Sequence, residues 1–368
     1  MYCRNRRASA QRKVRRHMRD CTDAPGWRSY LGHNCRAYHE RKWCHGGRLL
    51  NSSAGGALLG SPEHACCACG GPKPTTPLRQ AIFFATHTLD DVDERLLRHY
   101  SRELAAVPTV GLFTLLFRSE AAAPLVAGEL ATWDARSKRS GVDLWLWDEP
   151  GLRQLFPNLE LALHRSAAHK STPKAVANYF FFHCSLLLWN ATFGHSHPSI
   201  EYYWRMEPDA LFAGSLSRMV ELAAPVRVDV LLPHIEPQSN WAAWPHWSRN
   251  SELIANTPAD KRFMSLVSFG RYSAHFLRSI MAREWTAGKV GYEEITLPTT
   301  CATSSSPCSM ESFWRHCKIK SAKRCVFRPV WNCSSFLKAR QQETAELWHP
   351  VKDRRCVVEW LDGRGGVL

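Results

Sequence analysis

The sequence lacks the patterns that mark several common classes of enzyme. It contains neither G-x-G-x-x-G nor the phosphate-binding loop G-x-x-x-x-G-K-[ST], and no G-x-S-x-G occurs. These absences argue against a Rossmann dehydrogenase, a P-loop NTPase and an α/β-hydrolase. His183 and Cys184 are neighbours in the chain, which is wrong for a catalytic dyad, because the fold normally brings such partners together.

An apolar leader is also missing. The first twenty residues hold no apolar stretch of the length that a signal peptide or signal anchor requires. The most apolar run, 177–189, is interrupted by Asn178 and His183 and is too short to span a bilayer. We interpret this as a mis-assigned start codon or a lost short leader, the alternative being that the compartment inferred below is wrong. Membrane association is expected only through such a missing N-terminal anchor.

The net charge of +15 is unevenly distributed along the chain. Residues 1–50 carry thirteen Lys or Arg against three acids, so this segment holds +10 and the rest of the chain only +5. A basic leader can bind phosphate without specificity, but a solvated, disordered segment explains it better, and no nucleic-acid-binding motif accompanies it. We therefore expect no specific nucleic-acid partner.

The fourteen cysteines fall mainly into two groups of six. They are Cys21, Cys35, Cys44, Cys66, Cys67 and Cys69, and then Cys301, Cys308, Cys317, Cys325, Cys333 and Cys356. Even clusters predict disulfide frameworks and an oxidising compartment, with the pairing left open. Three N-x-S/T sequons, at Asn51, Asn190 and Asn332, are compatible with secretion. We expect the secretory pathway, either the Golgi lumen or the extracellular space.

Composition divides the chain into zones. A basic leader (1–20) precedes a Cys-rich, Gly-rich module (21–71) and a Pro-rich linker (72–78). A large α/β domain is expected over 79–356, followed by a tail (357–368). Apolar runs predict strands at Ala81–His87, Thr109–Phe117, Val142–Trp147, Ile200–Met206 and Val226–Leu232. Helical spacing and capping signals predict helices over Leu89–Leu104, Pro173–Phe193 and Leu211–Leu222. Such alternation implies a mostly parallel sheet with helices on both faces, whose ligands bind at the carboxyl ends of strands.

The acids Glu207 and Asp209 follow one of these strands directly. Two carboxylates one residue apart at a strand end can share a divalent cation or hold ribose and metal separately. The segment YYWRMEPDALFAGSLSRM resembles the acid-x-acid strand of GT-A glycosyltransferases, in particular of uncharacterised eukaryotic ones. The same resemblance includes Phe269–Ser273, Gly291–Thr299 and Trp348–Lys352, and covers about Ala81 to Arg355. The first acid is Glu rather than the Asp most common in that fold.

The resemblance implies a GT-A-like domain and a role for each residue of the site. Glu207 and Asp209 would hold Mn²⁺ or Mg²⁺ and a nucleoside-diphosphate sugar, with His349 as third metal ligand and Lys352 on the phosphates. If the enzyme inverts, Glu293 or Glu294 would be the base that takes the proton of the acceptor hydroxyl. A glycan or glycoprotein is the expected acceptor.

Two further features have alternative interpretations. Trp241, Trp244 and Trp247 could stack on a sugar or a nucleobase, or pack in the core. The Cys-rich module resembles a short extracellular module of algal, diatom and oomycete proteins, which implies three disulfides. The alternative is a zinc site that includes His64, Cys66 and Cys69.

Taken together, these features predict a disulfide module followed by a glycosyltransferase. A non-catalytic secreted carbohydrate-binding or adhesion protein with a degenerate transferase domain is the alternative. A basic nucleic-acid-associated protein is a more distant one.

Overall fold

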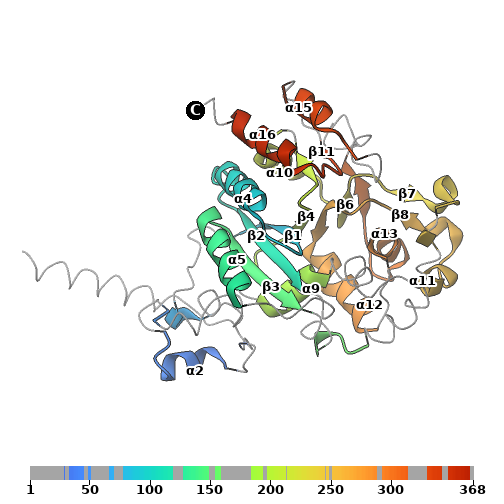
Figure 1. Cartoon of the computed structure of the whole chain (residues 1–368). Coiled ribbons are helices and arrows are strands. Elements are labelled where there is room, and N and C mark those ends of the chain that lie inside the picture. The colour runs from blue at the N-terminus through green and yellow to red at the C-terminus, as the bar shows by residue number, and fades with distance from the viewer. Residues whose placement is uncertain are drawn as a thin grey trace, which may run out of the picture.

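The computed structural model describes fifteen segments of the chain. These are residues 29, 33–44, 49–50, 66–69, 78–118, 127–148, 154–158, 184–193, 197–212, 214–244, 246–247, 251–287, 292–313, 330–341 and 347–364. They form an α/β domain with a central sheet and helices on both of its faces (Figure 1). A small N-terminal module contains α2 (Cys35–Glu40) and η3 (Cys67–Cys69).

The central sheet has seven strands in the order β10-β6-β9-β4-β1-β2-β3. Their bounds are β1 (Gln80–Thr86), β2 (Val110–Arg118), β3 (Asp143–Asp148), β4 (Tyr202–Met206), β6 (Val230–Leu232), β9 (Phe269–Ser273) and β10 (Met310–Ser312). Strands β4, β1, β2 and β3 pair in parallel, as do β6 and β10, whereas β9 is antiparallel to both of its neighbours. The expected mostly parallel sheet is therefore confirmed. Its carboxyl-terminal edge is shared by every strand except β9.

Successive side chains along each strand point to opposite faces of the sheet, and each face has its own hydrophobic core. On β1, Ile82 and Phe84 point to one face and Ala81 and Phe83 to the other, and all four are buried. The first face is covered by α4 (Asp91–Leu104), α10 (Leu216–Ala223) and α16 (Arg354–Arg364), with α5 (Ala127–Ser140) packed beside α4. The second is covered by α9 (Cys184–Phe193), the π-helix η8 (Phe276–Met281), α12 (Ala282–Thr286) and α13 (Glu293–Thr303). Figure 1 shows the two layers on either side of the sheet.

Most predicted elements are present, and one is wrong in part. The helix predicted over Leu211–Leu222 begins only at Leu216, after Ser215. Leu211–Phe212 instead form the short strand β5, paired antiparallel with β11 (Leu347–Trp348). Tertiary pairing outweighs the local helical pattern here, since both residues of β5 are completely buried. The strand predicted over Val226–Leu232 is confined to β6, and only Cys184–Phe193 of the helix predicted over Pro173–Phe193 lies within the described residues.

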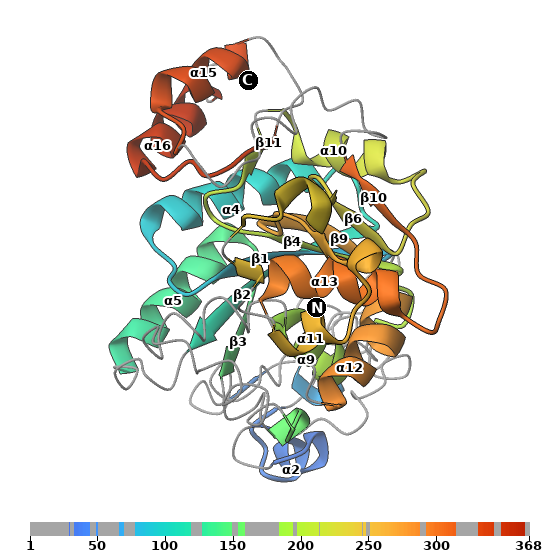
Figure 2. The same cartoon turned by 90° about the vertical axis from the view of Figure 1, so that its right-hand side faces the viewer.

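The remaining elements lie outside the central sheet. They are β7 (Glu236–Pro237), η5 (Gln238–Trp241), α11 (Ser251–Ala255), η7 (Ala259–Lys261), β8 (Phe263–Met264) and α15 (Cys333–Gln341). In both views α15, α16 and β11 lie together at one end of the domain (Figures 1 and 2). Helix α16 continues past residue 356, and its Val357 and Trp360 are buried in the same core as α4. The core of the domain therefore includes part of the segment predicted as a tail.

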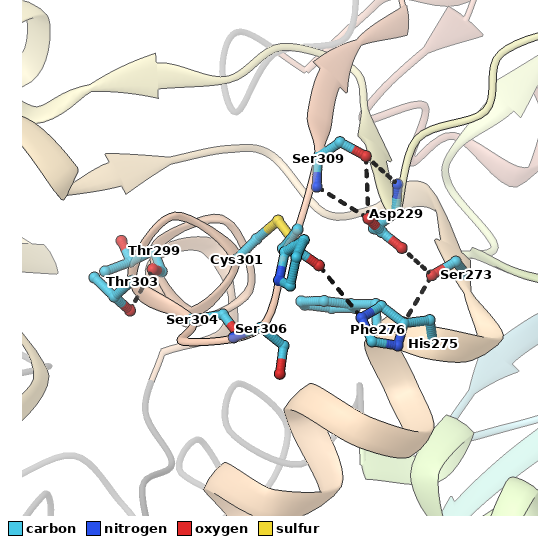
Figure 3. Close-up of a disulfide and its surroundings, with 12 residues drawn as sticks. Asp229, Ser273, His275, Phe276, Thr299, Cys301, Thr303, Ser304, Ser306 and Ser309 are labelled. Carbon is cyan, nitrogen blue, oxygen red and sulfur yellow. Dashed lines mark hydrogen bonds between the residues drawn. A yellow bond between two sulfur atoms is a disulfide. The ribbon is translucent and has the colours of Figure 1, made fainter.

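Four disulfides lie among the described residues. Two of them, Cys35–Cys66 and Cys44–Cys69, lie within the N-terminal module. Because Cys66 and Cys69 are oxidised, they are excluded as ligands of a zinc site. Cys333–Cys356 joins α15 to α16, and Cys301–Cys308 links the end of α13 to the segment before β10. There Asp229 accepts hydrogen bonds from Ser273 Oγ and Ser309, beside Cys301 (Figure 3). The four disulfides indicate an oxidising environment.

Other features bear on the predicted compartment. Asn332 is exposed at the start of α15, while the side-chain oxygen of Asn190 accepts hydrogen bonds from Tyr203 and Arg278. Asn51 lies outside the described residues. Within the described residues, no helix combines the length and apolar character needed to cross a bilayer.

Candidate functional site

The acid pair lies in a turn at the carboxyl end of β4. The Glu207 amide donates to the Ser268 carbonyl at 2.8 Å, and the Ala210 amide donates to the Glu207 carbonyl at 3.1 Å. The chain then enters β5, which pairs with β11. The Val351 amide, three residues after β11, donates to the Asp209 carbonyl at 3.0 Å. The segment that follows β11 is thereby held against the acid pair.

This pairing brings Glu207, Asp209 and His349 into one cluster. His349 Nε2 lies 3.7 Å from Glu207 Oε2 and 3.6 Å from Asp209 Oδ1. One ligand atom from each of the three residues lies within 4.8 Å of the other two, a spacing at which all three could contact one metal ion. His349 is buried and the two acids are partly exposed. The cluster is thus fixed by the protein and open on one side.

Lys352 extends from the same segment. Its Nζ lies 3.4 Å from Asp209 Oδ2, and its side chain is 65% exposed. A cation this exposed can turn toward an anionic ligand beside Asp209 without losing much solvation. The structure therefore brings together the four residues that the sequence assigned to metal and donor.

Arg205 is a member of the site to which the sequence had assigned no role. It lies on β4 two residues before Glu207, on the same face of the strand, and is completely buried. Its Nη2 donates to Glu207 Oε1 at 2.8 Å, and its Nη1 donates to Glu293 Oε2 at 2.6 Å. The signal in the sequence was a charge inside an otherwise apolar strand, since a buried arginine requires an anionic partner.

The charge pairs of Arg205 shift its own pKa and contribute to that of Glu207. Burial alone would lower the pKa of Arg205, but the carboxylates of Glu293 and Glu207 raise it instead. Burial alone would raise the pKa of Glu207. The hydrogen bond with His349 and the charge of Arg205 outweigh burial, so that this pKa is lowered. Glu207 is therefore ionised at neutral pH, as a metal ligand must be.

Glu293 and Glu294, the two predicted bases, occupy different environments at the start of α13. Glu293 is buried and makes a two-point ion pair with Arg205, whose Nη2 also contacts Glu293 Oε1 at 3.2 Å. Glu294 is also buried, and its Oε2 has no hydrogen-bond partner among the described residues. Burial raises the pKa of Glu294 well above its usual value, and the neighbouring charges of Glu293 and Glu207 raise it further. The two acids therefore differ in their contacts.

The predicted tryptophan cluster divides between core and surface. Trp247 is buried, Trp244 is partly buried, and Trp241 is 45% exposed. Packing in the core is thus confirmed for Trp247, whereas stacking on a ligand stays a prediction for the exposed Trp241.

Comparison with models of known protein families gives no match, and curated protein sequences give none either.

Proposed function

We propose that this protein is a glycosyltransferase of GT-A-like fold that transfers a sugar from a nucleoside-diphosphate donor to a glycan or glycoprotein. The observation that carries the proposal is the convergence of Glu207 and Asp209 with His349, which is 140 positions later in the chain than Asp209. They meet at the carboxyl-terminal edge of a mostly parallel sheet, where such sheets bind their ligands. The sequence resemblance to GT-A enzymes points to the same residues.

The residues suit a divalent cation, Mn²⁺ or Mg²⁺. Ligand atoms about 2.1 Å from one ion are separated by about 3.0–4.2 Å in octahedral geometry, and the 3.6 and 3.7 Å separations here fall inside that range. Carboxylates suit both ions, and the imidazole of His349 favours Mn²⁺ over Mg²⁺. Arg205 and Lys352 offset only two of the three carboxylates of Glu207, Asp209 and Glu293. A cation would thus find an excess of negative charge. When bound, it would neutralise charge on the diphosphate leaving group.

Lys352 supports a role in holding the donor. Its ammonium group is exposed and lies beside Asp209, so a phosphate bound at the cluster would lie within its reach. As a compact point charge, lysine suits phosphate without requiring a fixed orientation. The donor diphosphate would thus be held by the cation on one side and Lys352 on the other.

Glu294 is the better candidate for the base of an inverting reaction. Glu293 is already committed to Arg205, whereas one carboxylate oxygen of Glu294 has no partner among the described residues. The raised pKa of Glu294 also makes its carboxylate a stronger proton acceptor than an ordinary glutamate. We therefore assign Glu294 as proton acceptor and Glu293 as a positioning residue that fixes Arg205 and, through it, Glu207. The disulfides support a location in the secretory pathway.

A donor screen on the full chain tests this function. The protein, produced under oxidising conditions, is mixed with UDP-, GDP- and CMP-sugars in the presence of Mn²⁺, Mg²⁺ or EDTA. Its melting temperature and the hydrolysis of each donor are then measured. We expect one donor class to stabilise the protein only when a divalent cation is present. Asp209→Asn should abolish this effect.

Asp362→Asn is the matched control, because it removes an exposed acid on α16 that pairs with Arg95. It should behave as the wild type. A folded wild-type protein that responds to no donor would contradict the proposal and favour a non-catalytic carbohydrate-binding protein.

A further inference from the structure

An exposed tryptophan lies three residues before Trp244, which packs against Tyr292 at the start of α13. Trp241 ends the short helix η5 and keeps 45% of its surface accessible, which is unusual for the largest apolar side chain. Its contribution to the fold comes through its backbone, because its carbonyl accepts hydrogen bonds from Trp247 Nε1 and from the Trp244 amide, both at 2.9 Å. The indole itself is thus available at the surface.

A backbone hydrogen bond joins this tryptophan to Trp244, which belongs to a cluster of aromatic rings at the start of α13. Trp244 packs against His246 and Tyr292, with ring centroids 4.9 and 5.9 Å apart, and His246 lies 5.0 Å from Tyr292. Tyr292 directly precedes Glu293 and Glu294. We call Trp241, Trp244, His246 and Tyr292 the aromatic platform. It ends at the two acids of the proposed catalytic site.

Hydrogen bonds also connect the segment of the platform with α13 through β8. The Ser265 amide, just after β8, donates to the Glu294 carbonyl at 2.8 Å. Thr299 on α13 exchanges hydrogen bonds with the backbone of Phe263 in β8. Strand β8 pairs with β7 (Figure 1), and the chain continues from β7 directly into η5, which ends at Trp241. Strand pairing and hydrogen bonds to β8 thus connect the segment that carries Trp241 with α13.

Polar side chains accompany the exposed ring. Asn240 donates to Glu236 Oε2 at 2.9 Å, and Arg262 donates to Gln238 Oε1 at 3.1 Å. These carboxylate and amide groups can exchange hydrogen bonds with hydroxyl groups. An aromatic face combined with a few fixed polar groups suits a ligand that has both apolar C–H faces and many hydroxyls.

We propose that the aromatic platform binds a sugar ring of the acceptor, with Trp241 as the stacking residue. The proposal rests on the transferase function and assigns the acceptor side of the same site. A nucleobase could also stack on the ring. The platform adjoins Glu294, where the acceptor hydroxyl must lose its proton, whereas the exposed phosphate-binding group Lys352 belongs to the segment after β11. The acceptor is therefore the better occupant.

The test measures saccharide binding to the full chain without nucleotide or metal. Chitobiose, cellobiose, lactose and maltose are titrated in EDTA, with saturation-transfer NMR as the readout, against the wild type, Trp241→Ala, Trp241→Phe and Asp209→Asn. We expect at least one disaccharide to bind, with affinity about tenfold lower in Trp241→Ala and largely retained in Trp241→Phe. Asp209→Asn should bind the disaccharide as the wild type does, so failure of the donor site would not hide the platform.

Other outcomes would overturn the proposal. Equal saccharide affinity in the wild type and Trp241→Ala would place the sugar elsewhere, and absence of binding by every disaccharide would remove the acceptor assignment. Loss of nucleotide affinity in Trp241→Ala, with saccharide binding unchanged, would make the ring a nucleobase platform. Circular dichroism checks that each variant is folded, which we expect because the carbonyl of residue 241 remains in place.

Discussion

Arg205 and Glu293 form a buried two-point ion pair that links β4 to α13, with an Nη1–Oε2 distance of 2.6 Å. The same guanidinium holds Glu207 at 2.8 Å, so one buried cation connects the predicted metal ligand with one of the predicted bases. Burying the charges of Arg205 and Glu293 is unfavourable unless each is paired and hydrogen-bonded. The arrangement therefore fixes the two halves of the site relative to each other.

Glu293→Gln should destabilise the protein strongly. It leaves Arg205 buried with Glu207 as its remaining partner, and breaking a buried ion pair by removing one member typically costs about 3–5 kcal/mol. We expect the free energy of unfolding, from urea denaturation, to fall by about 3 kcal/mol. Glu221→Gln, which breaks the exposed pair with Arg218, is the control and should cost less than about 1 kcal/mol. Equal effects of the two variants would contradict a structural role for the buried pair.

Glu294→Gln should act on turnover and leave binding intact. The amide cannot accept a proton, and loss of a general base typically lowers kcat by about 10²–10⁴-fold. We expect donor and Mn²⁺ affinities within about twofold of the wild type, because Glu294 is neither a predicted metal ligand nor part of the Arg205 ion pair. Steady-state kinetics combined with calorimetric titration of Mn²⁺ would check both expectations. Undiminished kcat in this variant would return the role of base to Glu293 or to another group.

The sequence predicted the metal cluster better than the contacts that support it. Glu207 and Asp209 could be found because they follow an apolar strand directly, and His349 because the resemblance extends to Trp348–Lys352. The pairing of β5 with β11 could not be predicted, since both strands are two residues long and depend on tertiary contact rather than local pattern.

The ion pair of Arg205 could not be predicted from the sequence for a different reason. The position of Arg205 inside an apolar strand was visible, but its partner Glu293 lies 88 residues away. Only the packing of α13 on the face of β4 that carries Arg205 shows which of two adjacent acids is paired. The same packing decides that Glu294 keeps a carboxylate oxygen without a partner among the described residues. Neighbouring acids in a sequence therefore acquire different roles only through the fold.

Lys352→Met should separate stability from donor binding. Lys352 is 65% exposed, and an exposed ion pair of this kind contributes about 0–1 kcal/mol to folding. Removal of its charge should nevertheless weaken binding of a nucleoside diphosphate about tenfold, in line with the loss of one charge-assisted hydrogen bond. Thermal denaturation and calorimetry with UDP and GDP in Mn²⁺ would measure the two effects. Unchanged nucleotide affinity would remove Lys352 from the donor site.

The disulfide Cys333–Cys356 should matter to the metal cluster as well as to stability. It connects α15 to α16, and Trp331, just before α15, donates hydrogen bonds to the carbonyls of His349 and Pro350. Replacing both cysteines by alanine opens a loop with a sequence separation of 23, which corresponds to about 3 kcal/mol in the chain-entropy model. We expect lower stability together with weaker Mn²⁺ affinity.

The double alanine variant at Cys301 and Cys308 is the comparison for this disulfide. Its loop has a sequence separation of 7, equivalent to about 2 kcal/mol, and lies far along α13 from Glu293. It should lose stability while retaining Mn²⁺ affinity. The role of Cys333–Cys356 in positioning His349 would be refuted by equal Mn²⁺ affinities in the two variants.

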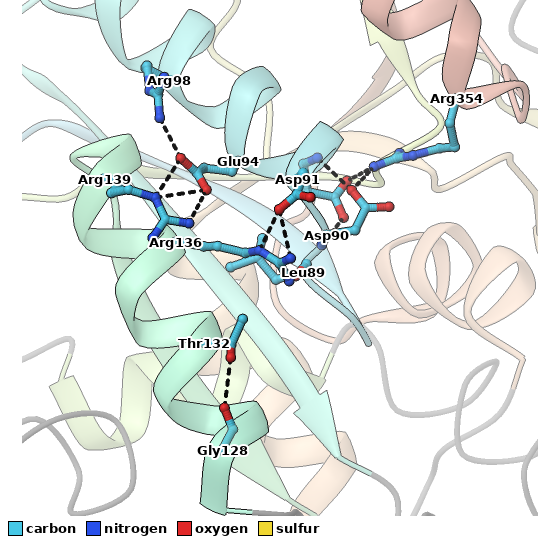
Figure 4. Close-up of polar contacts among 11 residues, drawn as sticks. Leu89, Asp90, Asp91, Glu94, Arg98, Gly128, Thr132, Arg136, Arg139 and Arg354 are labelled. Carbon is cyan, nitrogen blue, oxygen red and sulfur yellow. Dashed lines mark hydrogen bonds and ion pairs between the residues drawn. The ribbon is translucent and has the colours of Figure 1, made fainter.

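A buried acid at the start of α4 should make stability depend on pH. Asp90 and Asp93 form a capping box there, and Arg354 of α16 contacts both side chains at 2.6 Å. Figure 4 shows Arg354 reaching Asp90, with Asp91 and Glu94 paired to arginines nearby. Burial raises the pKa of Asp93 to about 6, although Arg354 acts in the opposite direction.

The sign of the effect follows from proton binding. Between the pKa of an unfolded aspartate, about 3.9, and a folded value near 6, the folded protein retains a proton that the unfolded chain has lost. The contribution of Asp93 to stability is therefore full below pH 4 and is lost as the pH rises toward 6, by at most about 3 kcal/mol. Asp93→Asn does not titrate, so the stability of the wild type relative to this variant should decrease over that interval. Urea denaturation of both proteins at pH 4, 5, 6 and 7 measures the difference, in which most other titrating groups cancel. If the ion pair with Arg354 instead dominated, the pKa of Asp93 would lie below 3.9, and the relative stability of the wild type would fall only on acidification below pH 4.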